Sequence, residues 1–402
     1  MDNPLSKIFI TSPVVIDGGF GTTLEQWFQL DISNTPLWST NAVVDHADLV
    51  IEAHLAFLRA GAELISTSTY QCSYPTFARA GYTTADARCI MFKSVQLASK
   101  AREIFRDEQV RNGTPVRNVR IALSLGPFGA SLEPAQEFDG FYPPPFGPKA
   151  YTHMDAENGN NFGDDEVAKN ESIDALTLFH LERLLILFEN EAMWSSLDCI
   201  AFETVPLTRE IWAIRRAMGL LHDRVGAGRV SISDKAKPWW ISMVFPNGIY
   251  PETTKDGFSR IQVADIVSAA IEHQSMNHPC PSGLGINCTQ VEYLPKLISE
   301  FEGSLQNFQK TQSSLDCDSD LLDNNIIKPW LVLYPNGGDI YDPVTQNWVE
   351  KNQANEEHWA RTLTKSYTPS RIWAGVLLGG CCRTTPIHIQ SLKQMVQSDI
   401  NP

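Results

Sequence analysis

The chain alternates eight times between a short apolar run and a segment whose apolar residues have helical spacing, and this pattern constrains the fold most strongly. Continuous apolar strands separated by amphipathic helices are typical of a parallel sheet covered by helices. Eight such units favour a single (β/α)8 TIM barrel over an open sheet. The expected strands are residues 14–17, 63–67, 119–125, 199–202, 239–245, 283–288, 330–334 and 374–378. The expected helices are residues 48–60, 84–105, 174–194, 208–222, 259–273, 291–302, 355–366 and 385–398.

The main alternative is a doubly wound sheet that binds a dinucleotide. Its fingerprint needs three glycines in the first strand–helix turn and an acidic residue after the second strand. Gly19 and Gly21 are present here, but the third glycine position is Leu24 and the second strand ends in Ser66-Thr67. We therefore expect the barrel, as one domain over residues 1–402.

Two stretches interrupt the alternation. Residues 153–170 contain Asn158-Gly-Asn-Asn161 and Gly163-Asp-Asp-Glu166, and residues 303–326 are rich in Ser, Gln, Asp and Asn. Such polar composition predicts solvent-exposed, partly mobile insertions in the loops of the barrel.

Composition limits which binding partners and which cellular compartment are expected for this chain. The net charge of −15 repels phosphate backbones, so no nucleic-acid partner is expected. No run of 18 apolar residues occurs, so no membrane-spanning segment is expected. The first residues, Met1-Asp-Asn-Pro-Leu-Ser-Lys7, lack the charged and apolar regions of a signal peptide, which predicts a cytoplasmic location. In that compartment the eight cysteines are expected to be reduced thiols.

Three of these cysteines lie where a barrel carries its chemistry, at the carboxyl ends of strands. Cys288 ends the sixth expected strand, and Cys381 and Cys382 follow the eighth. Those strands are next-but-one neighbours in a closed barrel, so their thiols can converge, and a kink at Gly379-Gly380 would turn both later sulfurs inward. Three thiolates with an open fourth position are typical of a catalytic zinc site. The alternative is that all three are buried small apolar residues.

Two acidic residues also end expected strands. Asp17 follows the first strand and Glu203 follows the fourth. They either cap helices or pair with nearby arginines, or they bind the ammonium group of a substrate. His180 lies on the helix that follows the third strand, where a position against the barrel is expected rather than a catalytic one.

Several motifs resemble the signatures of the homocysteine S-methyltransferase family. The most specific are Gly285-Ile-Asn-Cys288 and Gly379-Gly-Cys-Cys382. The others are Asp17-Gly-Gly-Phe-Gly-Thr-Thr-Leu-Glu25, Gly126-Pro-Phe-Gly-Ala130, Glu137-Phe-Asp-Gly-Phe-Tyr142, Phe179-His-x-x-Arg183 and Phe202-Glu-Thr-Val-Pro206. They follow the family order over nearly the whole chain, and the two insertions leave them intact.

This resemblance implies a zinc-dependent barrel enzyme that methylates L-homocysteine to methionine. Zn2+ would be held by Cys288, Cys381 and Cys382, and the homocysteine sulfur would take the open position as a thiolate. A free thiol titrates at about pH 8.5, so coordination would supply the deprotonated form at neutral pH. No general base is then needed for the methyl-transfer step.

The resemblance also implies the residues that bind the amino acid. Asp17 and Glu203 match positions that bind the amino group of homocysteine in related enzymes. The backbone of Gly18 and the side chain of Thr67 match positions near its carboxylate.

The expected methyl donor is a sulfonium compound, S-methylmethionine or S-adenosylmethionine. Folate-dependent synthases need a further module, and betaine-type relatives carry a long dimerisation segment after the cysteine pair, whereas here twenty residues follow Cys382. A monomer is expected for the same reason. The alternatives are a betaine-type homocysteine methyltransferase, and a non-catalytic zinc or redox protein in which Cys381 and Cys382 sense thiol chemistry.

Overall fold

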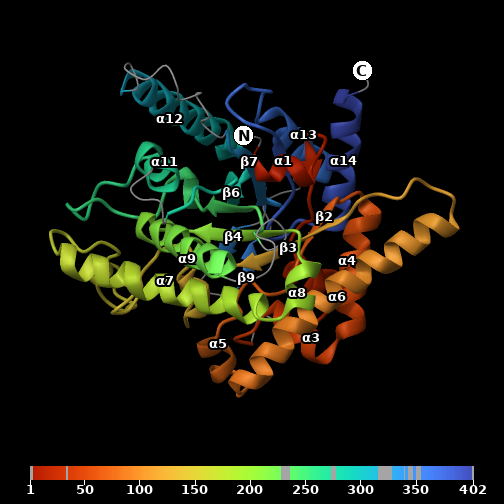
Figure 1. Cartoon of the computed structure of the whole chain (residues 1–402), viewed down its shortest axis with the longest axis horizontal. Helices are drawn as coiled ribbons and strands as arrows, with labels where there is room; N and C mark the ends of the chain where they lie inside the picture. Colours follow the sequence, from red (N-terminus) through yellow and green to blue (C-terminus); the bar gives the residue numbers. More distant parts are fainter. Residues whose placement is uncertain are drawn as a thin grey trace.

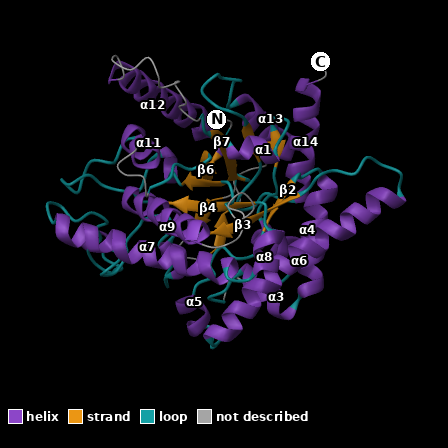
Figure 2. Cartoon of the chain, viewed as in Figure 1, coloured by secondary structure: helices purple, strands orange, loops and turns teal. Residues whose placement is uncertain are grey.

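Each of the eight apolar runs forms a β-strand in the computed structural model, and the eight strands make one parallel sheet at the centre of the molecule (Figure 2). The structure describes residues 3–32, 35–227, 236–272, 278–315, 328–338, 340–342, 347–349 and 355–400. The strands are β1 (Val14–Val15), β2 (Leu64–Ser66), β3 (Arg120–Leu125), β4 (Cys199–Val205), β5 (Trp239–Met243), β6 (Gly283–Gln290), β7 (Trp330–Asn336) and β10 (Val376–Leu378). All eight expected strands are therefore confirmed.

The sheet closes on itself. Its order is β1-β10-β7-β6-β5-β4-β3-β2, so each strand pairs with its neighbours in the chain order of the barrel. A parallel bridge between Ile16 and Leu64 joins the two ends of this order. The hydrogen bonds from Asp17 N to Leu64 O (3.0 Å) and from Glu63 N to Val15 O (2.7 Å) flank that bridge. The fold is a (β/α)8 TIM barrel, as expected.

Helices surround the sheet (Figure 1). Those that follow the strands are α2 (Phe20–Phe28), α3 (Ser39–Asp45), α4 (Ala47–Ala60), α5 (Tyr74–Arg79), α6 (Thr84–Arg111), α7 (Glu166–Phe188), α8 (Glu191–Ser196), α9 (Thr208–Ala227), α11 (Val263–Ile271), α12 (Leu294–Leu315), α13 (Glu356–Lys365) and α14 (Pro386–Ile400). A short hairpin of β8 (Ile340–Asp342) and β9 (Asn347–Val349) follows β7.

Local sequence signals set several helix ends. Thr83 caps α6 through a reciprocal box with Asp86, which satisfies backbone N–H groups that the first turn leaves free. α4 ends at Gly61, whose φ of 118° is readily adopted by glycine. α14 begins at Pro386, which fits the first turn because that turn has no use for its missing N–H.

The barrel interior is closed at the amino-terminal ends of its strands by α1 (Pro4–Ile8). Asn3 Nδ2 donates to Ser282 O (2.8 Å) and Lys328 O (2.7 Å), and these two residues come just before β6 and β7. Trp330 Nε1 donates to Ser6 Oγ (3.0 Å). The residues buried together inside the barrel are Leu5, Phe9, Val14, Ile16, Leu64, Ala122, Cys199, Ala201, Trp240, Trp330, Val332, Tyr334 and Leu377. The opposite end of the barrel, at the carboxyl ends of the strands, is where the predicted site residues lie.

The expectation for residues 153–170 is partly wrong. Their polar composition suggested an exposed, mobile insertion, but Asn160 is only 1% exposed. Its Nδ2 donates to Asp139 O (2.7 Å) and Pro251 O (2.9 Å), and its Oδ1 accepts from Thr253 N (3.0 Å). A buried asparagine with satisfied hydrogen bonds ties this stretch to an earlier part of the same β3–α7 connection and to the loop after β5.

The second expected insertion, residues 303–326, also differs in its first half. Residues 303–315 continue α12 as a helix, and residues 316–326 lie outside the described part of the chain. Within the described residues, no helix is both long enough and apolar enough to cross a membrane.

Candidate active site

The three sulfurs predicted to converge do converge. The Sγ atoms of Cys288, Cys381 and Cys382 all lie within 4.8 Å of one another, and those of the last two are 4.0 Å apart. Cys288 lies on β6, while Cys381 and Cys382 follow β10. They form the one group of three or more potential metal ligands found among the described residues.

Local backbone geometry aims Cys288 into the barrel. Its φ is 48°, in the left-handed region that non-glycine residues rarely adopt. The pairing register between β6 and β7 shifts between Asn287 and Gln290, so the regular alternation of side chains ends at this position. Strain of this kind persists only where surrounding contacts hold it, and it clusters at functional sites.

The expected glycine kink before Cys381 is not what the structure shows. Neither Gly379 nor Gly380 has a left-handed φ. A Cβ atom at Gly379 would overlap the Ile16 side chain, and one at Gly380 would overlap the side chain of Thr384. These two glycines are needed because neighbouring chain segments approach them closely, which brings the turn after β10 against the tip of β1.

Asn287 connects the sulfurs to β4. Its Nδ2 donates to Thr204 Oγ1 (2.8 Å) and lies 3.4 Å from Cys288 Sγ and 3.9 Å from Cys381 Sγ. Its Oδ1 accepts from Thr204 N (2.8 Å). Thr204 has a φ of 61° and its hydroxyl is 3.6 Å from Cys288 Sγ, so both strained residues belong to one hydrogen-bonded unit.

The thiols share their protons unequally. Hydrogen bonds from Cys288 and Cys382 lower the pKa of Cys381 well below its usual value. Hydrogen bonds with Cys381 and Cys382, together with burial, raise the pKa of Cys288 well above its usual value. Three adjacent thiols that cannot all ionise on their own are a donor set for a cation.

Asp17 lies beside this cluster, at the tip of β1. Its carboxylate accepts from Ser66 N (2.6 Å) and Ser66 Oγ (3.2 Å). Burial raises its pKa to about 7, against the lowering effect of Ser66, and the charge of Cys381 also raises it. Among the described residues no arginine pairs with Asp17 and it caps no helix, so it is a buried acid held by Ser66.

Glu203 lies on β4, next to Thr204. Its pKa is raised to about 8, chiefly by burial and also by the charges of Cys381 and Asp17, while a hydrogen bond with Ser124 lowers it. Two carboxyl groups with raised pKa values beside a thiol cluster form an acceptor for a cation, because a positive charge would stabilise their ionised forms.

The two remaining predicted positions lie at the same end of the barrel. Thr67 Oγ1 accepts from Ser124 N (3.1 Å) and shares a hydrogen bond with Thr69 Oγ1 (2.7 Å). Gly18 follows Asp17, and a Cβ atom there would lie 2.8 Å from the Phe57 ring and 2.9 Å from Thr384 O. Both residues shape the rim between β1 and β2.

Tyr70 and Glu137 lie near the sulfur cluster, and neither was predicted to have a role there. The pKa of Tyr70 is raised well above its usual value, mainly by burial and then by the charges of Glu137 and Cys288. Tyr70 also hydrogen-bonds Thr204. The available signals were the position of Tyr70 just after β2 and the place of Glu137 at the start of a family-like motif.

The Phe179-His-x-x-Arg183 motif acts behind the site. Arg183, which is buried, donates to Gly126 O (2.6 Å) and Tyr70 O (2.7 Å), so it fixes the turns after β3 and β2. His180 Nε2 lies 3.0 Å from Glu210 Oε1. The expectation that His180 packs against the barrel is confirmed, since it is fully buried.

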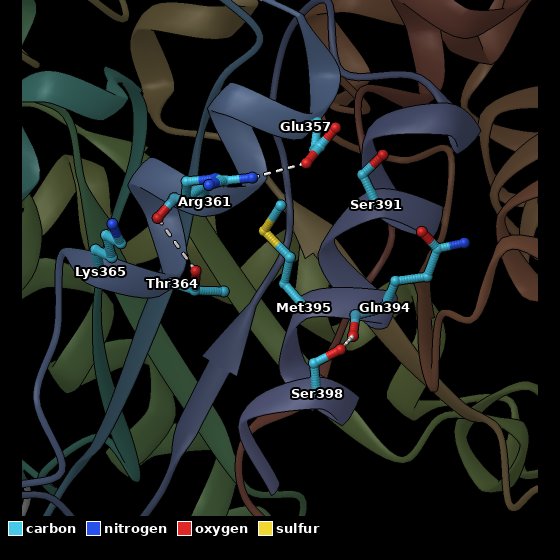
Figure 3. A pocket seen from close by; sticks show the side chains of 8 residues that line it. All are labelled: Glu357, Arg361, Thr364, Lys365, Ser391, Gln394, Met395 and Ser398. Carbon is cyan, nitrogen blue, oxygen red and sulfur yellow. Dashed lines mark hydrogen bonds and ion pairs between the residues drawn. The ribbon is translucent and has the colours of Figure 1, made fainter. Parts of the chain in front are cut away.

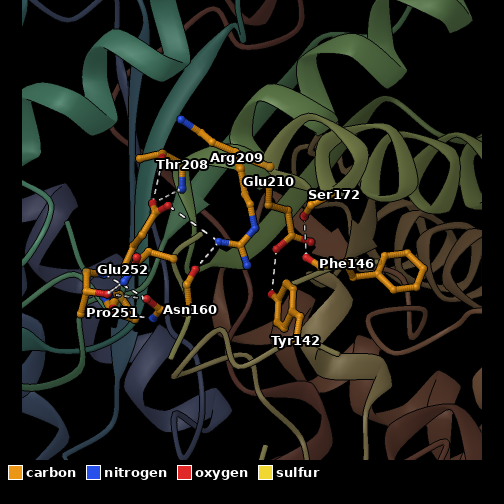
Figure 4. A network of polar contacts seen from close by, with 12 residues as sticks. Tyr142, Phe146, Asn160, Ser172, Thr208, Arg209, Glu210, Pro251 and Glu252 are labelled. Carbon is orange, nitrogen blue, oxygen red and sulfur yellow. Dashed lines mark hydrogen bonds and ion pairs between the residues drawn. The ribbon is translucent and has the colours of Figure 1, made fainter. Parts of the chain in front are cut away.

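A buried polar network extends this support (Figure 4). Glu210 Oε2 accepts from Tyr142 OH (2.8 Å). Arg209 donates to Asn160 O (2.5 Å) and lies 3.8 Å from Glu252. Charged side chains that are buried and paired in this way hold the loops after β3, β4 and β5 together.

A cavity of about 450 Å3 lies elsewhere, between α13 and α14 in the outer layer (Figure 3). Most of the residues that line it are of polar types, and Glu357 Oε1 accepts from Arg361 Nη2 at 2.7 Å. None of the predicted site residues lines it; the lining residues are Glu357, Arg361, Thr364, Lys365, Ser391, Gln394, Met395 and Ser398. This groove is therefore separate from the sulfur cluster.

The cysteine cluster fits a zinc ion. Zn–S bonds of ~2.3 Å in a tetrahedron place sulfurs ~3.8 Å apart. The 4.0 Å between Cys381 and Cys382 is close to that separation, and three soft sulfur donors leave a fourth position free. The residues present could hold the metal without rearrangement of their strands.

Known proteins resemble this chain over almost its whole length. The homocysteine S-methyltransferase family model matches residues 14–396. Homocysteine S-methyltransferase 2 of Arabidopsis thaliana is 30% identical over 94% of this chain and 91% of its own length. Homocysteine S-methyltransferase YbgG of Bacillus subtilis is 29% identical over 98% of both chains. The metallated form of the homocysteine methyltransferase MmuM from Escherichia coli superposes with a TM-score of 0.61 at 24% identity, covering 98% of this chain and 100% of that one. The chain belongs to the homocysteine S-methyltransferase family.

Proposed function

We propose that this protein transfers a methyl group from a sulfonium donor, S-methylmethionine or S-adenosylmethionine, to the thiolate of L-homocysteine, giving methionine. The observation that carries the proposal is the group of three sulfurs within 4.8 Å of one another at the open end of the barrel. Two acids, the buried Asp17 and the half-buried Glu203, lie beside it. Membership of the family supports homocysteine as the acceptor.

The metal proposed for the site is Zn2+, held by Cys288, Cys381 and Cys382. When bound, zinc would supply a Lewis acid that keeps a thiol substrate deprotonated near neutral pH. Asn287 and Thr204 hold the Cys288 backbone in its left-handed conformation, so the three sulfurs stay directed at one point. This preorganisation leaves the fourth position to the sulfur of homocysteine.

Asp17 and Glu203 are proposed to bind the ammonium group of homocysteine. Burial raises the pKa of Asp17 to about 7 and that of Glu203 to about 8. A bound ammonium group would stabilise the ionised form of both carboxyl groups. Ser66 keeps the Asp17 carboxylate in place through two hydrogen bonds. Gly18 and Thr67 are proposed to lie against the substrate carboxylate at the same rim.

The test is methionine formation by the purified protein from homocysteine with S-methylmethionine, S-adenosylmethionine or betaine supplied separately. We expect turnover with at least one sulfonium donor and none with betaine. Turnover with betaine alone would replace the donor assignment. A zinc-loaded protein that forms methionine with none of the three would favour the thiol-sensor alternative.

Three further expectations stay predictions: a cytoplasmic location, a monomeric state and the absence of a nucleic-acid partner. The net charge of −15 supports the last of these, because it opposes binding to phosphate backbones. Sedimentation of the purified protein would measure its oligomeric state directly.

A further inference from the structure

Glu137 is held in a fixed position at the carboxyl end of β3. It follows the 3-10 helix η1 (Phe128–Ser131), and Gln136 N donates to Gly129 O (2.9 Å). A Cβ atom at Gly129 would lie 2.6 Å from the Gln136 carbonyl and 2.7 Å from Glu137 N. The absence of a side chain at Gly129 therefore lets the segment that carries Glu137 pack directly on η1.

One oxygen of the Glu137 carboxyl group lacks a hydrogen-bond donor among the described residues. Its Oε2 atom is fully buried, and no described residue donates a hydrogen bond to it. Burial raises the pKa of this group to about 7, and the charge of Asp139 adds to that rise. A buried acceptor without a donor is costly, so we expect this oxygen to meet a donor from outside the chain, a water molecule or a ligand.

Glu137 interacts electrostatically with other residues of the sulfur site than Asp17 and Glu203 do. Among charged groups, Cys381 is the neighbour that raises the pKa of both those acids. The Glu137 charge acts instead on Tyr70, where it is the largest influence after burial. It also contributes to the raised pKa of Cys382. Larger effects on that pKa come from the hydrogen bond with Cys288, which lowers it, and the hydrogen bond with Cys381, which raises it.

We propose that Glu137 binds the α-ammonium group of the methyl donor, on the Cys382 side of the cluster, while Asp17 and Glu203 bind the acceptor on the Cys381 side. The inference deepens the proposed function and rests on it, because it assumes a sulfonium donor with an amino acid head group. Such a donor carries two cations, the sulfonium and the ammonium.

The reaction itself favours the ammonium as the partner of Glu137. A new C–S bond forms to homocysteine as the donor C–S bond breaks, and its electron pair stays on the donor sulfur as a neutral thioether. A carboxylate against the sulfonium would stabilise a charge that disappears in the transition state and would slow the transfer. A carboxylate against the ammonium binds ground state and transition state equally, so it acts on donor KM rather than on kcat.

The test compares Glu137→Gln with Glu133→Gln, a variant in the same loop whose native side chain is 75% exposed. Loss of one buried charge-assisted contact should raise the KM for S-methylmethionine by about 10- to 100-fold. The homocysteine KM, the zinc content and kcat should change by less than about two-fold, and Glu133→Gln should match the wild type. A rise in homocysteine KM instead, or an unchanged donor KM, overturns the assignment.

A second arm uses N-acetylated S-methylmethionine, which keeps the sulfonium and lacks the ammonium. The wild type should use it about 10- to 100-fold less well than S-methylmethionine, and Glu137→Gln should no longer distinguish the two donors. A variant that distinguishes them as the wild type does contradicts the proposal. If the wild type uses betaine alone, the sulfonium assignment has failed, and that result appears before any variant is compared.

Discussion

The side-chain amide of Asn287 exchanges two hydrogen bonds with Thr204, each 2.8 Å long, between the ends of β6 and β4. The same amide nitrogen lies 3.4 Å from Cys288 Sγ and 3.9 Å from Cys381 Sγ. Asn287 therefore both braces a strained backbone and donates toward two of the three proposed metal ligands. Contacts of this kind orient ligands and moderate their charge.

Replacement of Asn287 should weaken metal binding. Asn287→Ala removes both functions, and zinc affinity should fall by about 10- to 100-fold. Asn287→Asp keeps an acceptor for Thr204 N but places a negative charge beside the thiols, so its loss should be at least as large. Competition with a chromogenic chelator measures the affinity, and the thiolate charge-transfer band of the cobalt-substituted protein reports the geometry. Wild-type affinity in Asn287→Asp would show that the amide plays no such part.

Homocysteine binding should depend on pH in a defined direction. Asp17 and Glu203, with pKa values raised by burial to about 7 and about 8, must be ionised to receive an ammonium group. Below those values each must first lose a proton, so the homocysteine KM should rise as the pH falls from about 8 through about 7. The Glu203→Gln variant should have a higher KM at pH ~8 and a shallower pH dependence, because one of the two titrating groups is gone. A KM that is constant over this range in the wild type contradicts the assignment.

The buried asparagine of the loop 153–170 should matter for stability. Asn160→Ala leaves the carbonyl groups of Asp139 and Pro251 and the N–H of Thr253 without their partner. The free energy of unfolding should fall by about 2–4 kcal/mol, measured by urea titration. Asp164→Ala is the control, because that side chain is 97% exposed and its ion pair with Lys255 should contribute less than ~1 kcal/mol. Equal stability of the two variants would mean that the loop is not anchored through Asn160.

A methyl group at Gly126 should disturb the rim of the site. A Cβ atom there would lie 2.8 Å from the Tyr70 ring and 2.9 Å from its carbonyl oxygen. Gly126→Ala should therefore displace Tyr70, with a loss of about 1–3 kcal/mol in stability and a lower kcat/KM. Gly303→Ala is the control, because nothing lies within 4 Å of its position in α12 and alanine favours a helix. Unchanged kinetics in Gly126→Ala would argue against a role for Tyr70 near the substrates.

The barrel was predictable because the same strand–helix pattern occurs eight times in the sequence. Each strand is buried on both faces, so each appears in the sequence as a continuous apolar run, and eight repeats outweigh uncertainty at any one boundary. The convergence of Cys288 with Cys381 and Cys382 followed from the same regularity, since inward side chains of alternate strands meet in a barrel.

The remaining features depend on local geometry that composition does not encode. The left-handed backbone at Thr204 and Cys288 arises from tertiary contacts, and neither residue type favours that conformation. Asn160 lies in a polar stretch typical of exposed loops, yet contacts with distant residues bury it. The demand for glycine at Gly379 comes from the Ile16 side chain, which is far away in sequence.

The most direct test of the central claim measures zinc content and methionine formation on the same samples of wild type, Cys382→Ala and Cys89→Ser. Cys89 is exposed and remote in sequence from the cluster, so its variant controls for loss of a thiol as such. The account predicts about one zinc ion per chain and full methionine formation from homocysteine and a sulfonium donor in the wild type and in Cys89→Ser. Cys382→Ala should lose both together. Full methionine formation by metal-free Cys382→Ala would contradict the account.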